Sequence, residues 1–250
     1  MIRTGWLQPL VSEFNGVMPF PASAQAQGTL SGGLGAFRLE QVEFVGKNEF
    51  VEVRGNGRME NLGSLGGAWL DFSTSIRTDQ FGRVASAYGL DLPFSGQGSA
   101  QARVRGSRGG ILVDEIVMTL SSDALSLQAG GSIGPLGPSA EYQLQFDSSA
   151  DDLTRLAGLY GFEFPAGYTG RATGLLEGVK EDLHARDLEI ILESETTRVE
   201  ASGAVGPLGP ALKLNMPFNA RTNDMGALAS YLGKPLPVSG TGSAQGILAG

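Results

Sequence analysis

The residue types that usually carry chemistry are few in this chain. It has one histidine, His184, and no cysteine, which argues against a histidine- or thiolate-based metal site and a thiol nucleophile. Two carboxylate pairs, Asp151-Asp152 and Glu181-Asp182, stand at a predicted helix start and in a predicted turn. Capping and solvation explain both pairs, and His184, ahead of a predicted strand, is interpreted as a surface residue. The sequence therefore predicts no catalytic residue, no metal site and no cofactor, and hence no enzyme.

Two glycine phrases share the first glycines of a phosphate-binding loop. They are Gly96-Gln97-Gly98 and Gly240-Thr241-Gly242. The third glycine of the G-x-G-x-x-G pattern is missing, because Gln101 and Gln245 occupy that position. The phrases also lead into predicted strands, whereas phosphate is cradled at a helix N-terminus. We therefore interpret them as turns.

The sequence has one cluster of basic residues, which consists of Arg103, Arg105 and Arg108. Both a solvated strand face and a lipid-headgroup site fit this cluster, and the alternating pattern favours the solvated face. The net charge of −8 argues against nucleic acid, which needs a basic surface that displaces counterions. No apolar run approaches the ~20 residues of a membrane-spanning helix, and the first residues lack the apolar core of a signal peptide.

The elements that position these residues repeat along the chain. Pro93, Pro165 and Pro237 are evenly spaced, and the phrase Gly134-Pro135-Leu136-Gly137-Pro138 returns at the same interval, beginning at Gly206. Self-similarity at a fixed period indicates a repeat architecture. The predicted organisation is a tail helix of a preceding unit at 1–17, repeat units at 18–89, 90–161 and 162–233, and the start of a further unit at 234–250.

Each unit combines short alternating segments with one short helical segment. Ile116 and Met118 share one side of such a segment, while Val117 and Thr119 lie on the other. This period of two is typical of a sheet with one apolar and one solvated face. Helical spacing recurs at 79–88, 151–160 and 223–232, and also at 5–16. The sequence predicts a mainly β protein, an elongated repeat array of antiparallel strands with one short helix per repeat unit.

The apolar positions of these strands are the candidate binding residues. They could form a closed core beneath the helices or a second sheet, or they could line an open groove. A groove would take acyl chains, which gain about 0.8 kcal/mol per buried CH₂ without directional contacts. The lipid-facing candidates are Ile116, Met118, Leu125, Leu127, Tyr142, Leu144, Phe146, Leu188, Ile190, Leu192, Leu212, Leu214 and Met216.

The phrases that link helix to strand resemble a known family. One runs Leu159-Tyr160-Gly161-Phe162-Glu163-Phe164-Pro165, and the other runs Leu232-Gly233-Lys234-Pro235-Leu236-Pro237. Each follows a leucine-containing helix and precedes alternating strands. This order resembles the AsmA-like family of Gram-negative envelope proteins, which includes the TamB and YhdP types, and the resemblance covers nearly the whole chain.

The resemblance implies a periplasmic protein that an N-terminal helix tethers to the inner membrane. It implies a sheet that curls into an apolar groove and conducts phospholipids toward the outer membrane. This chain lacks such an anchor, so we expect a fragment of the repetitive periplasmic region. The expected partners are phospholipid acyl chains, neighbouring repeats of a longer chain and possible envelope proteins. The alternative is a structural or interaction scaffold that assists outer-membrane protein assembly without conducting lipid.

Overall fold

The computed structural model forms two compact units. One unit comprises Met1–Ser122 and Gly130–Glu141, and the other comprises Asp123–Ala129 and Tyr142–Gly250. The structure describes residues 2–4, 23–33, 36–62, 67–87, 95–107, 110–137, 139–159, 161, 163–208, 213–226 and 240–250.

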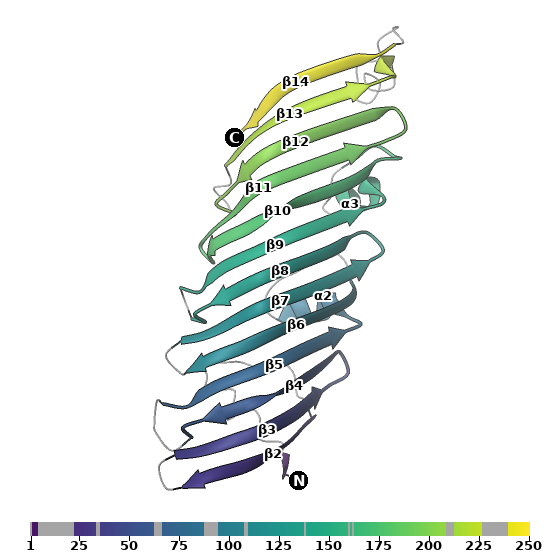
Figure 1. Cartoon of the computed structure of the whole chain (residues 1–250). Helices are drawn as coiled ribbons and strands as arrows, with labels where there is room; N and C mark the ends of the chain where they lie inside the picture. The colour runs from purple at the N-terminus through teal and green to yellow at the C-terminus, as the bar shows by residue number, and fades with distance from the viewer. Residues whose placement is uncertain are drawn as a thin grey trace. The chain divides into compact units, whose positions relative to one another are not determined.

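The first unit is a sheet in which each strand pairs antiparallel with the next strand of the chain (Figure 1). The strands are β1 (Ile2–Thr4), β2 (Ser23–Gly33), β3 (Ala36–Lys47), β4 (Val51–Glu60), β5 (Trp69–Thr78), β6 (Gly96–Ser107) and β7 (Gly110–Ser122). The repeat pattern did not predict β1. The helix expected at 5–16 lies outside the described residues.

The second unit follows the same rule from β10 to β14. Strand β8 (Ser126–Gly134) is divided between the units, and β9 (Glu141–Ala150) belongs to the second except for its first residue. The remaining strands are β10 (Thr169–Val179), β11 (Asp182–Glu193), β12 (Thr197–Val205), β13 (Leu214–Thr222) and β14 (Gly242–Ala249). The predicted mainly β class, with antiparallel strands and short helices, is confirmed.

The register between strands sorts side chains by polarity. In the first unit Val53, Ile76, Ala100 and Met118 face one another in a row across β4 to β7. In the second unit, a row from Leu192 runs through apolar residues to β14. Residues one position along each strand point to the opposite face, since successive side chains alternate. Each unit therefore has one apolar and one polar face.

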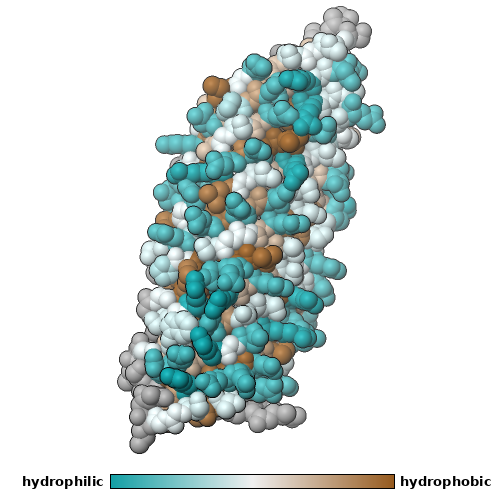
Figure 2. Space-filling model, in the orientation of Figure 1, coloured by the Kyte–Doolittle hydropathy of each residue, from teal (hydrophilic) through white to brown (hydrophobic). Residues whose placement is uncertain are grey.

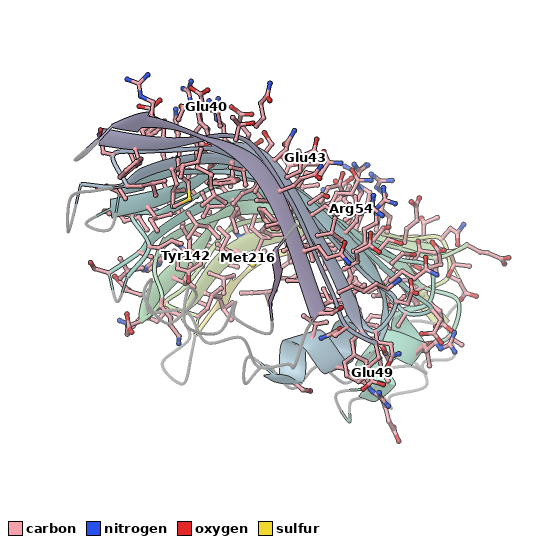
Figure 3. The ribbon with its side chains drawn as sticks, turned by 90° about the horizontal axis from the view of Figure 1, so that it is seen from below. Glu40, Glu43, Glu49, Arg54, Tyr142 and Met216 are labelled. Carbon is pink, nitrogen blue, oxygen red and sulfur yellow. The ribbon has the colours of Figure 1, made fainter. Side chains whose placement is uncertain are left out.

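Figure 3 shows which face lies inside the curve of the strands. In the first unit, Glu40, Glu43 and Arg54 project from the convex side. In the second unit, Tyr142 and Met216 lie on the concave side. The apolar face of each unit is therefore the concave one.

Two short helices follow the fourth strand of their repeats. They are α2 (Phe81–Ala87) and α3 (Leu153–Leu159), and they begin at equivalent positions of consecutive repeats. The Asp152 carboxylate accepts a hydrogen bond from the Arg155 backbone N–H at 3.2 Å, which caps α3 as predicted. Gly161 has φ +76°, the left-handed conformation expected after a helix end. Most of the third predicted helix, from residue 227 on, lies outside the described residues. The unit boundaries at 18–89, 90–161 and 162–233 stay a prediction.

The interpretation of Gly96-Gln97-Gly98 as a turn is wrong, whereas Gly240 does lie in a bend (φ +140°) ahead of β14. Gly96, Gln97 and Gly98 lie within β6, and Gly242 begins β14. Gly98 and the equivalent Gly170 also lie close to the helix that precedes their strand. A Cβ atom on Gly98 would lie 3.4 Å from the Phe81 ring, and one on Gly170 would lie 2.8 Å from Leu153 Cδ2. Gly98, Gly170 and Gly242 occupy equivalent positions of successive repeats, and Met225 occupies the helix position over Gly242.

A bulge also recurs in the second strand of each repeat. Gln41, Glu115 and Asp187 have φ values of 50°, 51° and 49°, which is rare for residues other than glycine. The pairing of β3, β7 and β11 with their neighbouring strands is interrupted by a shift in register, as expected at a β-bulge. Glu115 and Asp187 keep the spacing of the repeat, whereas Gln41 precedes Glu115 by two positions more than that spacing.

We expect Gly57→Ala to destabilise the first unit. A Cβ on Gly57 would lie 2.1 Å from the backbone oxygen of Asp71 on the paired strand. Backbone atoms cannot rotate away, so the free energy of unfolding should fall by about 1–3 kcal/mol, measured by urea denaturation. Gly46→Ala is the control, because nothing lies within 4 Å of its Cβ position. Equal losses in the two variants would contradict the argument.

Candidate functional site

The predicted lipid-facing residues lie on the strands in the expected alternation. Ile116 and Met118 are on β7, and Leu127 is on β8. Leu125 lies one residue before β8, and Leu212 lies outside the described residues. The others lie on β9, β11 and β13: Tyr142, Leu144, Phe146, Leu188, Ile190, Leu192, Leu214 and Met216.

Register brings several of these residues into rows across the second unit. Ile190 faces Ala172 on one side and Ala201 on the other, and that row continues to Phe218 and Gly246. Leu192 faces Gly170 and Val199 in the neighbouring row. Large and small residues alternate along the row through Ile190, and the two rows together give a continuous apolar surface.

Phenylalanine rings lie against glycines on this surface, a feature that the sequence analysis missed. A Cβ on Gly174 would lie 3.1 Å from Phe146 Cζ, and one on Gly246 would lie 2.7 Å from Phe218 Cε1. The second pair repeats the first at the interval of the repeat. The first unit has a similar arrangement, with the Phe44 ring at the Cβ position of Gly55. Because glycine has no side chain, each ring can lie against the neighbouring strand and projects less from the sheet. The sequence signal for this contact was a glycine at a strand position where the alternation calls for an apolar side chain.

The apolar faces are not sealed within the described part of the chain. No large side chain there falls below 2% relative exposure. Ile76 is 40% exposed although paired strands flank β5 on both sides. Leu188 and Met216 are 8% and 4% exposed, so they form the floor of the second unit's concave face. The remaining described candidates are half-buried.

The helices cover only one end of the apolar faces. Phe81 of α2 lies over Gly98, near the start of β6, and Leu153 of α3 lies over Gly170, near the start of β10. Ala85 of α2 is buried, and the Arg83 guanidinium lies 4.9 Å from the centre of the Phe50 ring. These contacts hold α2 at the ends of the strands, so among the described residues neither helix lies over the middle of a face.

The opposite, convex faces carry ion pairs. Figure 2 shows this side of the units, with mostly hydrophilic and a few scattered hydrophobic residues. In the first unit, Arg103 donates two hydrogen bonds to Asp71, at 2.8 and 2.9 Å. In the second, Arg171 Nε donates to Asp147 at 3.1 Å. These hydrogen bonds hold the pKa of the Asp71 and Asp147 carboxyls below their ordinary values.

The predicted basic cluster lies on the polar face of the first unit. Arg103 pairs with Asp71, and Arg105 pairs with Asp114. Arg108 lies outside the described residues. The two described arginines therefore have partners within the protein, which supports the solvated-face interpretation.

His184 lies within β11, and not ahead of a strand as predicted. Its Nε2 lies 2.9 Å from Asp182 Oδ1, and the ring is half-buried against Gly206. The strand starts earlier than expected because Asp182 already pairs with Val179 across a short hairpin. Within the described residues, no three histidine, cysteine or acidic side chains gather where a metal ion could bind.

Comparisons of the chain with protein-family models, with curated proteins and with solved structures find no match. None of the helices in the described residues is both long enough and apolar enough to cross a membrane. The function is therefore inferred from the polarity and exposure of the two faces of each unit.

The Asp71–Arg103 pair predicts a pH dependence of stability. The folded-state pKa of Asp71 lies below its ordinary value of 3.8 because Arg103 hydrogen-bonds the carboxylate. The pair therefore stabilises the fold above that value, and this contribution is lost as the pH falls through the folded-state pKa. We expect Asp71→Asn to lower the urea midpoint at pH 6, and the difference from the parent to shrink as the pH falls below 3.8.

The control for this measurement is Asp151→Asn. Asp151 is exposed and forms no ion pair within the described residues. Its substitution should leave the urea midpoint nearly unchanged at both pH values. A difference for Asp71→Asn that stays constant with pH would contradict a role for the ionised carboxylate.

Proposed function

We propose that the concave apolar faces of this protein bind the acyl chains of lipids. The observation that carries this proposal is the exposure of Ile76 in the middle of a paired sheet, together with the lack of any fully buried large side chain among the described residues. A sheet packed against a second layer would bury such positions. Binding of an apolar ligand to a half-exposed apolar face is favourable, because it removes apolar surface from water.

Acyl chains suit this surface better than a polar ligand would. The rows contain apolar and small residues, with few polar side chains to orient a ligand. Burial of about ten CH₂ groups is worth about 8 kcal/mol, since each contributes about 0.8 kcal/mol. That gain needs no directional contact, so the chains could shift along the rows.

The wider role that we propose follows the resemblance to AsmA-like proteins. The chain would be part of a periplasmic lipid-conducting β-groove, tethered to the inner membrane in the full-length protein, that takes part in phospholipid transport between the inner and outer membranes. The single apolar concave face of each unit and the repeated helix–strand order support this role. The alternative role, an outer-membrane assembly scaffold, would use the sheet without a lipid.

Charged substitutions on the apolar face should abolish lipid capture. We expect Ile76→Asp, Leu144→Asp and Leu214→Asp each to weaken binding of a fluorescent long-chain fatty acid by at least about tenfold, because a carboxylate would have to be desolvated against the chain. Titration of the purified variants measures this. Circular dichroism confirms that each keeps its strands, and Ile76→Asp is the safest variant because the side chain is already exposed.

Matched controls lie on the polar face of the same strands. Arg77→Asp, Gln143→Asp and Asn215→Asp each place a new carboxylate next to one of the test positions. These controls should bind the fatty acid as the parent does. Equal binding by folded test and control variants would contradict the proposal and favour the scaffold.

A further inference from the structure

An open depression lies at one end of β12, β13 and β14 in the second unit. Its volume is about 730 Å³, and it spans the first residues of β12 and β14 and the last of β13. Residues from both faces line it. Arg198, Arg221 and Ser243 come from the polar face, while Thr222 and Gly242 come from the apolar face.

Two arginines oppose each other in this depression. Arg198 and Arg221 are direct partners across β12 and β13. Like charges directly opposite in a sheet are destabilising. Arg198 is neutralised by Glu193 and Glu200, at 3.3 and 2.8 Å. Arg221 lines the depression and forms no ion pair within the part of the chain that the structure describes.

Hydroxyl groups from both faces also line the depression. Thr197 and Thr222 are only 5% and 7% exposed, and the Thr197 hydroxyl donates to Thr222 Oγ1 at 3.0 Å. The Thr222 hydroxyl in turn donates to the Asp224 backbone oxygen at 3.2 Å. This buried chain fixes the strand ends. Ser243 lies directly opposite Arg221, and Thr241 lies nearby on the same wall.

We propose that Arg221, with the hydroxyls of Ser243 and Thr241, binds a phosphate group. A guanidinium binds phosphate through paired hydrogen bonds, and hydroxyls donate to the remaining oxygens. The bound anion would also relieve the repulsion between Arg221 and Arg198. Glu195 lines the same depression, and its negative charge would weaken the binding of an anion.

The phosphate could belong to a lipid headgroup or to a free phosphate ester. The lipid source rests on the proposed function. The depression lies where the polar and apolar faces meet at the strand ends, so a headgroup there would leave its chains next to the apolar rows. The row at the depression consists of Thr197, Thr222 and Gly242. The next row on the same face, two residues further along each strand, is apolar and consists of Val199, Ala220 and Ala244.

The test is a titration of the purified chain with inorganic phosphate, followed by the NMR signals of the arginine Nε–H groups. We expect saturable shifts at Arg221, and binding about tenfold weaker in Arg221→Gln. Glu195→Gln should bind phosphate more tightly, since a like charge is removed. The control is Arg77→Gln, which changes the equivalent arginine of an earlier repeat, on β5, where the direct partner is Glu52 instead of an arginine. Unchanged phosphate binding in folded Arg221→Gln overturns the site.

A second titration separates the two sources of phosphate. Dihexanoyl phosphatidic acid should bind more tightly than inorganic phosphate if the site serves a lipid headgroup, and Arg221→Gln should remove that binding. Equal affinities would support the phosphate site and contradict its lipid role. Binding of an uncharged long-chain alcohol tests the apolar faces independently, because the alcohol carries no anionic group for a guanidinium and its binding should survive Arg221→Gln.

Discussion

The hydrogen-bonded ladder between consecutive strands carries this fold. In a layered domain, the packing of two apolar surfaces supplies most of the stabilisation. Here the described residues include no fully buried large side chain, so cross-strand pairs take a larger share. Each strand is held mainly by its two sequence neighbours. That arrangement stabilises a sheet while leaving one face apolar and half-exposed, and the proposed binding function depends on this face.

Glycine makes the exposed face compatible with this ladder. At Gly98, Gly170 and Gly242 the missing side chain admits a residue of the preceding helical segment, which anchors that segment at the strand ends. At Gly174 and Gly246 it admits a phenylalanine ring. Glycine therefore allows the helices to pack at the strand ends and the aromatic rings to lie close to the sheet. Both effects leave the middle of the face open to a flexible apolar ligand.

Much of the fold could be predicted because period-two alternation and a fixed repeat are local signals. They predicted most of the strands, the positions of α2 and α3, and the sides on which Met118 and Val117 lie. The strand character of Gly96-Gln97-Gly98 could not be predicted from turn propensity, because it depends on pairing with β7 and β5, which turn propensity does not describe. The pairing of His184 with Asp182, two positions apart on one strand, depended on β11 beginning at Asp182, earlier than expected. The Arg198–Arg221 pair likewise becomes visible only when β12 and β13 are aligned.

The most direct test of the central claim is native mass spectrometry with lipid extraction on the chain purified from a bacterial periplasm. Our account predicts co-purifying phospholipid in roughly stoichiometric amounts, released when the complex is activated in the gas phase. A folded, monodisperse and lipid-free protein that also fails to take up added phospholipid would contradict the claim, because it would mean that the apolar faces are closed.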